Sequence, residues 1–191
     1  MTVWFPIALA FGLLTGSLFS GWQEPVRPEG WTVRVGHGIA RNDTKRPSGF
    51  QITHLLPSLE VPLTETVGPR WARGRIVWSP ELQLALFSVP NVRPLFGAHP
   101  LQMKYELTPI GKWTPYVLGG VGGIYSNIER PETGSEGNFS FVSAVGTRFR
   151  VNETTDWLIE YRHHHLSNND ADRQNNGVDA ETFLTGFSLK F

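Results

Sequence analysis

Apolar and polar residues alternate along most of the chain after residue 30, a pattern that predicts β-strands with one apolar face. The clearest segments are residues 31–40, 101–107, 139–151, 156–167 and 181–191, and weaker alternation covers residues 50–61, 73–87 and 113–126. Turn residues separate these segments, and no apolar stripe with helical spacing is found among them. The pattern therefore predicts an all-β fold with eight strands.

The size of the apolar side chains distinguishes between two kinds of barrel. Aromatic residues stand near several strand ends, among them Trp31, Tyr105, Trp157 and Phe191. Eight strands enclose a space only just wide enough for side chains, so this many rings would be difficult to pack inside. In an outer-membrane barrel the same residues contact lipid and form interfacial girdles. We therefore predict an eight-stranded antiparallel up-and-down transmembrane β-barrel, with a soluble lipocalin-like barrel as the alternative.

The opposite strand faces carry charged and polar residues that this fold would place in the bore. They are Arg34, Lys104, Glu106, Arg148, Glu160, Arg162 and His164. Charges remote from water must pair, so a structural charge network is expected there. An even strand number places both termini and the short turns, near 108–112 and 152–155, in the periplasm. The longer polar connections, near 41–49, 127–138 and 168–178, then face outward.

The N-terminal segment is apolar from Val3 to about Leu14, which is too short to span a bilayer as a helix and is typical of a signal peptide. Cleavage could follow Ser17, Ser20 or Gly21, although no Lys or Arg precedes Arg27 to form a basic n-region. We expect a signal peptide over about residues 1–21 and one barrel domain over 22–191. A buried N-terminal segment is the alternative.

Composition excludes several classes of function. Lys plus Arg and Asp plus Glu number 17 each, so the formal net charge is zero and nothing favours nucleic acid as a partner. The chain has no cysteine, which excludes disulfides and thiolate metal sites. The glycine-rich segment 119–123 follows no strand–helix pattern, so close packing or strand bending is expected there instead of phosphate binding.

Three consecutive histidines and a serine lie at the outer end of the seventh predicted strand. Side chains two residues apart share a face of a strand. His163, His165 and Ser167 therefore continue the outward register of residues 157–161, whereas His164 points inward. Adjacent histidines on opposite faces cannot chelate one ion, so a three-histidine metal site is not expected.

Two acids in the eighth predicted strand share the outward register, Asp179 and Glu181. If the hairpin pairs symmetrically, Ser167 lies opposite Asp179, and His165 lies opposite Glu181 with Asp179 as its diagonal neighbour. A serine hydroxyl needs a base to take its proton, and the base needs an acid to orient it. The outward-facing patch formed by Ser167, His165 and these two acids therefore has the groups needed for acyl transfer. A metal site of two histidines and one of these acids would lack the ligand count of a structural zinc centre.

The terminal Phe191, which follows alternating apolar residues, resembles the C-terminal signature that the outer-membrane assembly machinery reads. The segment "HLSNNDADRQNNGVD" resembles the active-site hairpin of outer-membrane lipid A 3-O-deacylases. The matching residues are His165, Ser167, Asn168, Asn175 and Gly177, and the acid of the motif falls on Asp179. A known member of that family has glutamate at that position. Asp179 is therefore the expected acid, Glu181 is the alternative, and an impaired triad remains open.

The resemblance implies a serine esterase that hydrolyses the 3-O-linked acyl chain of lipid A, at the extracellular leaflet of the bacterial outer membrane. Ser167 would be the nucleophile, His165 the base and Asp179 its orienting acid. Candidates for oxyanion donors are the side chain of Asn175 and backbone amides of residues 168–177, with Asn168 bracing that loop. No metal or organic cofactor is expected. The implied partners are lipid A or lipopolysaccharide and membrane lipid, and a homodimer is left open.

A second class of function also fits the sequence. A non-catalytic small outer-membrane barrel, with a structural, adhesive or binding role, could carry the motif as a vestige. The aspartate in place of glutamate is consistent with that alternative.

Overall fold

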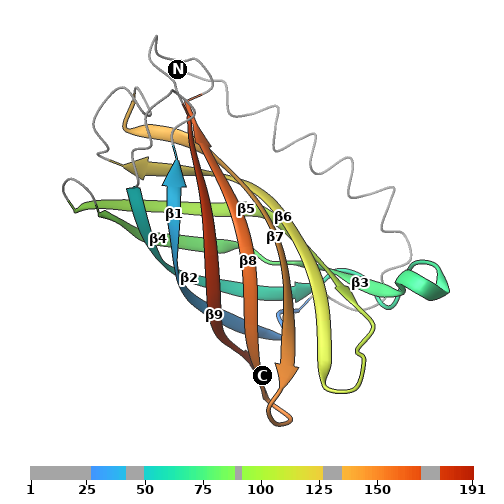
Figure 1. Ribbon diagram of the computed structural model, residues 1–191. Helices are drawn as coiled ribbons and strands as arrows, with labels where there is room; N and C mark the ends of the chain where they lie inside the picture. The colour runs from blue at the N-terminus through green and yellow to red at the C-terminus, as the bar shows by residue number, and fades with distance from the viewer. Residues whose placement is uncertain (1–26, 42–49, 89–91, 127–134, 169–176) are drawn as a thin grey trace, which may run out of the picture.

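The protein is a single antiparallel sheet that closes on itself into a barrel, as a computed structural model shows (Figure 1). The structure describes residues 27–41, 50–88, 92–126, 135–168 and 177–191. Its strands are β1 (Gly30–Arg41), β2 (Phe50–Pro62), β3 (Gly74–Trp78), β4 (Glu81–Ser88), β5 (Arg93–Leu107), β6 (Trp113–Ser126), β7 (Gly137–Arg150), β8 (Thr155–Ser167) and β9 (Val178–Lys190), and a 3-10 helix, η1 (Arg70–Ala72), precedes β3. Because β1 pairs with both β2 and β9, the ring is complete. Among the described residues, no helix has the length and apolar character needed to cross a membrane.

The nine labelled strands fill eight positions in the barrel wall because β3 and β4 share one position. Both of them pair with β2 on one side and with β5 on the other. The break between them falls at Ser79 and Pro80, and proline has no N–H to donate to a strand ladder. The predicted eight-stranded up-and-down barrel is therefore confirmed.

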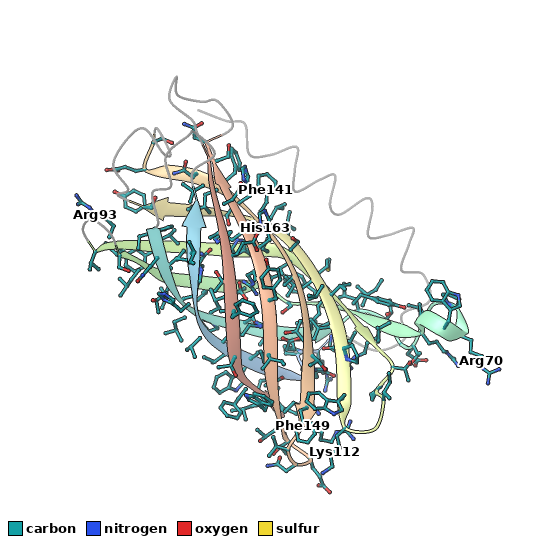
Figure 2. The ribbon with its side chains drawn as sticks, viewed as in Figure 1. Arg70, Arg93, Lys112, Phe141, Phe149 and His163 are labelled. Carbon is teal, nitrogen blue, oxygen red and sulfur yellow. The ribbon has the colours of Figure 1, made fainter. Side chains whose placement is uncertain are left out.

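The large apolar side chains point away from the bore. Phe183 is 72% exposed and Val35 is 48% exposed, whereas Arg34 and Thr182, their neighbours in sequence, are fully buried. Figure 2 shows this outer layer of side chains around the strands. A soluble barrel would fill its interior with the apolar face, and an outer-membrane barrel turns that face to lipid. The lipocalin-like alternative is therefore wrong.

Buried ion pairs occupy the middle of the bore. Arg162 Nη1 lies 2.6 Å from Glu81 Oε1, and its Nε donates to Glu160 Oε1 at 2.8 Å. Arg34 Nε lies 3.1 Å from the other oxygen of Glu160. These side chains are at most 2% exposed, so each charge is compensated by partners and not by bulk water. The predicted charge network is present.

His164 is an exception to that network. Its ring forms hydrogen bonds with the side chains of Ser140 and Gln83, both uncharged, in a layer next to the ion pairs. Beyond this layer, where β1, β6 and β8 end, the bore is filled by apolar side chains: Ile52, Ala85, Phe87, Leu95, Ile124, Leu166, Val178 and Ala180.

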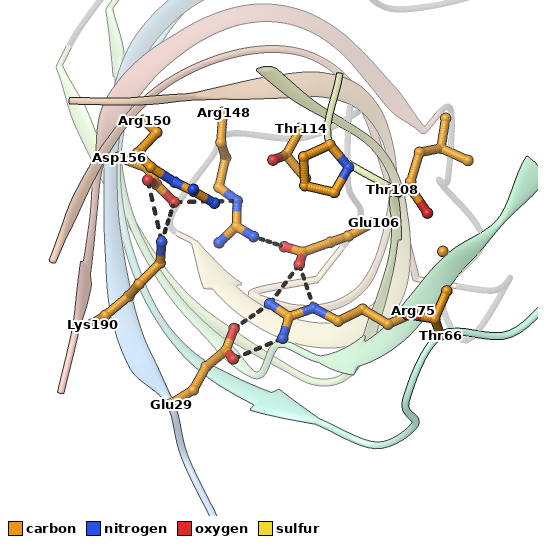
Figure 3. A pocket seen from close by; sticks show the side chains of 13 residues that line it. Glu29, Thr66, Arg75, Glu106, Thr108, Thr114, Arg148, Arg150, Asp156 and Lys190 are labelled. Atoms are coloured by element: carbon orange, nitrogen blue, oxygen red, sulfur yellow. Dashed lines mark hydrogen bonds and ion pairs between the residues drawn. The ribbon is translucent and has the colours of Figure 1, made fainter. Parts of the chain in front are cut away.

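The other end of the bore holds a polar cavity of about 290 Å³ (Figure 3). Arg75 pairs with both Glu29 and Glu106, and its Nε lies 2.9 Å from Glu106 Oε2. Lys190 Nζ of β9 lies 3.1 Å from Asp156 Oδ2 of the adjacent strand β8. The Arg75–Glu29 pair reaches past β2 to the segment before β1, whereas Arg75–Glu106 and Lys190–Asp156 each join neighbouring strands at this end of the barrel.

The glycine-rich segment brings β6 close to β5, as expected. A Cβ atom at Gly122 would lie 2.0 Å from the carbonyl oxygen of Ala98, so no larger residue fits without movement of the strand. The register of the β5–β6 pair shifts near this point, between Ala98 and Leu101. Glycine here serves close packing within the wall.

Candidate functional site

The outer face of β8 carries the three polar residues that the sequence places there. His163, His165 and Ser167 are partly exposed, whereas the residues between them are buried. Figure 2 shows His163 on the outer wall of the barrel, near Phe141 of β7. These side chains follow Ile159 and Tyr161 along the lipid-facing register, so the polar patch lies where the apolar band ends.

The strand register brings the two histidines directly opposite the two acids of β9. His165 pairs with Asp179 and His163 pairs with Glu181. The predicted symmetric pairing, with Ser167 opposite Asp179, is wrong, because the observed register is shifted from it by two residues. A shift of two residues leaves every side chain on the same face, so the apolar pattern could not determine it.

Two buried apolar residues and one glycine account for the observed register. Leu166 and Val178 pair across the hairpin and point into the apolar part of the bore. Gly177 precedes Val178 with a φ of +66°, a left-handed conformation that favours glycine. With Val178 opposite Leu166, the next residue of β9, Asp179, lies opposite His165.

The contact between His165 and Asp179 is short and direct. The Nδ1 atom of His165 lies 2.6 Å from Oδ1 of Asp179. A carboxylate only accepts, so Nδ1 is the donor and Nε2 is left to act as a base. The shorter side chain of aspartate reaches the ring because the two residues face each other across the strand pair. Asp179, and not Glu181, is the acid that contacts His165.

Ser167 completes the row of polar residues on this face. It is the last residue of β8, it is partly exposed, and its Cα partner is Phe139 of β7. Residues two apart on one strand face are separated by about 6.8 Å along the strand. Its hydroxyl therefore belongs to the same patch as the His165 ring.

The motif residues of the loop are described in part. Asn168 is 2% exposed and directly follows β8. A Cβ atom at Gly177 would lie 3.2 Å from Cε1 of His165. Glycine at this position therefore leaves room for the imidazole ring. Asn175 lies outside the described residues.

An apolar groove of about 880 Å³ runs along the outer wall below the patch. It is lined mainly by Val35, Val145, Ile159, Tyr161 and Phe183, from four neighbouring strands. Tyr161 pairs with Phe183 in the outward row next to His163 and Glu181. An extended hydrocarbon chain can lie in this groove with its polar end at the patch.

A second serine–histidine–acid arrangement lies inside the bore, and sequence reasoning missed it. The Ser140 hydroxyl lies 2.6 Å from His99 Nε2, and His99 Nδ1 lies 3.7 Å from Glu81 Oε1. All three residues are at most 2% exposed, so an ester in the membrane could not reach the hydroxyl. They come from three different strands, and nothing in the local sequence links them. Among the described residues, no group of histidine and acidic side chains is arranged to hold a metal ion.

The fold and the outer patch together define a class: a small outer-membrane-type barrel with a histidine–carboxylate contact and a serine on its lipid-facing wall. The family model described as "Lipid A 3-O-deacylase (PagL)" matches residues 67–188, which is more than half of the chain. The chain therefore belongs to the PagL family, as the resemblance in the hairpin predicted.

Solved structures confirm the architecture. The crystal structure of the outer membrane enzyme PagL is similar with a TM-score of 0.65 and 15% identity, over 81% of this chain and 97% of that chain. The crystal structure of Neisserial surface protein A (NspA) gives a TM-score of 0.59 and 11% identity, over 88% of this chain and 100% of that chain. No curated protein sequence matches significantly. At these identities the structural similarity shows the fold, and the family model shows the family.

Proposed function

We propose that the protein is a lipid A 3-O-deacylase, a serine esterase that acts on lipid A beside the barrel in the outer leaflet of the outer membrane. The single observation that supports this most strongly is the 2.6 Å contact between His165 and Asp179 on the lipid-facing wall. Family membership supports the substrate and the ester bond. The apolar groove below the patch supports an acyl chain as the group that is bound.

The reaction uses three side chains of the patch. Ser167 Oγ attacks the ester carbonyl carbon while Nε2 of His165 takes the hydroxyl proton. The resulting tetrahedral intermediate collapses, the bond to the 3-oxygen of the sugar breaks, and His165 returns its proton to that oxygen. Water activated by His165 then hydrolyses the acyl-enzyme and releases the 3-hydroxy fatty acid. Asp179 holds the Nδ1–H tautomer throughout.

The oxyanion of the intermediate needs hydrogen-bond donors close to Ser167. We assign this role to the side chain of Asn175 and to backbone amides of residues 168–177, with Asn168 bracing the loop. Gly177 contributes by leaving the His165 ring unobstructed. No step requires a metal ion or an organic cofactor.

The location of the patch suits a substrate that never leaves the bilayer. With both termini in the periplasm, the ends of β8 and β1 and the longer connections lie on the extracellular side, where lipid A resides. A signal peptide over about residues 1–21 would direct the chain to export, and this segment lies outside the described residues. The groove then extends from the headgroup level toward the middle of the membrane.

Release of fatty acid from lipid A tests the proposal against a non-catalytic barrel. The folded protein, in detergent and in lipid vesicles, is incubated with lipid A, and the products are followed by mass spectrometry. We expect the wild type to release one 3-hydroxy fatty acid per lipid A, and the variants Ser167→Ala and His165→Asn to release none. A wild type that leaves lipid A intact in both media would establish the non-catalytic alternative.

A further inference from the structure

A second histidine–carboxylate pair lies directly beside the first on the lipid-facing wall. His163 Nδ1 lies 2.8 Å from Glu181 Oε1. This pair is the next outward-facing pair across β8 and β9 after His165 and Asp179. His163 also reaches the neighbouring row, because its Nε2 lies 3.8 Å from Oδ1 of Asp179. The Asp179 carboxylate is therefore flanked by two imidazole rings.

The hydrogen bonds determine how the His163 ring is oriented. A carboxylate only accepts, so Nδ1 of His163 donates to Glu181 and Nε2 points toward Asp179. The His163 ring therefore lies between two carboxylates on adjacent rows. Like charges this close on one sheet face repel each other, and the ring between them holds them apart. This surface faces lipid, where interactions between charges are less screened than in water.

We propose that His163 and Glu181 are positioning residues of the lipid-facing site. Glu181 orients the His163 ring, and His163 keeps the Asp179 carboxylate turned toward His165. Asp179 is 44% exposed, so without this neighbour its carboxylate could rotate away toward lipid headgroups and water. The inference rests on the proposed function for its kinetic consequence. It also assigns Glu181 a role other than that of an alternative acid.

Kinetics of His163→Gln and Glu181→Gln test the proposal. For His163→Gln we expect kcat to fall about tenfold with KM nearly unchanged, because fewer molecules hold His165 in its reactive orientation. Glu181→Gln should show a smaller loss of the same kind. The matched control is Tyr125→Phe, which removes the hydrogen bond to Glu136 at the same end of the barrel but on another strand pair. Its kcat should equal that of the wild type.

A double variant separates action through Asp179 from a general effect on folding. If His163 acts through Asp179, the variant that carries both His163→Gln and Asp179→Asn should be no slower than Asp179→Asn alone. Independent, multiplying losses would overturn the proposal, as would a His163→Gln variant whose kcat stays within twofold of the wild type.

A spectroscopic measurement keeps the inference independent of activity. In the ¹⁵N-histidine NMR spectrum, the Nδ1 proton of His165 should be visible in the wild type and in Tyr125→Phe, and weakened by exchange in His163→Gln. An unchanged His165 signal in His163→Gln would overturn the positioning role. If the wild type releases no fatty acid, the proposed function fails, and this spectrum still decides whether His163 holds Asp179.

Discussion

His165 and Asp179 face each other across β8 and β9, with Nδ1 and Oδ1 2.6 Å apart. Asp179→Asn should lower kcat by about 10³–10⁴-fold, because an amide can present a donor to Nδ1 and stabilise the wrong tautomer. Glu181→Gln should lose far less activity. Initial rates of fatty acid release from lipid A measure both effects. An equal or larger loss in Glu181→Gln would make Glu181 the acid of the site.

Gly177 supports this contact through its backbone conformation and its lack of a side chain. Gly177→Ala should destabilise the protein by about 1–2 kcal/mol, because of the left-handed backbone, and should also reduce kcat by displacing the His165 ring. The control is Gly137→Ala, since a Cβ atom there meets nothing within 4 Å. Denaturant unfolding and the deacylation rate of both variants test this. Equal behaviour of the two alanine variants would contradict the role given to Gly177.

Phe183 forms one wall of the apolar groove and is 72% exposed to the membrane. In Phe183→Ala we expect kcat/KM to fall about tenfold for long acyl chains and much less for short ones, because apolar contact is lost only along the distal part of the chain. Met103→Ala, on β5 and outside the groove, is the control. Synthetic lipid A with acyl chains of different lengths provides the measurement. A loss that does not depend on chain length would mean that the acyl chain lies elsewhere.

Arg162 compensates two buried acids in the bore, Glu81 and Glu160. Arg162→Met should destabilise the barrel by about 3–5 kcal/mol, because it leaves uncompensated buried charge. Arg150→Met, at an exposed position at the end of β7, should change stability by less than about 0.5 kcal/mol. Urea unfolding in lipid vesicles measures both. A fully stable Arg162→Met variant would show that the network contributes little to the fold.

The lipid-facing and bore-facing registers could be predicted from the sequence because side-chain direction alternates strictly along a strand. Large aromatic residues on one register and charges on the other then determined which side meets lipid. Strand ends were less predictable. β5 begins at Arg93, well before the predicted start at residue 101, because Pro94, Gly97 and Pro100 are uncommon in strands and conceal the alternation.

The candidate site could be predicted to the level of its residues but not of its pairing. The alternation of side chains along each strand predicts that His165 and Asp179 point outward. Which residues pair across the two strands depends on the register, in which the buried residues Leu166 and Val178 lie opposite each other directly after Gly177. The buried Ser140–His99 contact could not be foreseen, because it joins strands that are far apart in the sequence. Only the closed barrel brings those two side chains together.

The two serines give the most direct test of where the chemistry takes place. The folded protein in lipid vesicles is treated with a fluorophosphonate, which reacts with an activated serine hydroxyl, and the adduct is located by peptide mass spectrometry. We predict one adduct, on Ser167, formed at a rate that falls strongly in His165→Asn and is accompanied by loss of lipid A deacylation. An adduct on Ser140, or full deacylation by Ser167→Ala, would contradict a lipid-facing active site.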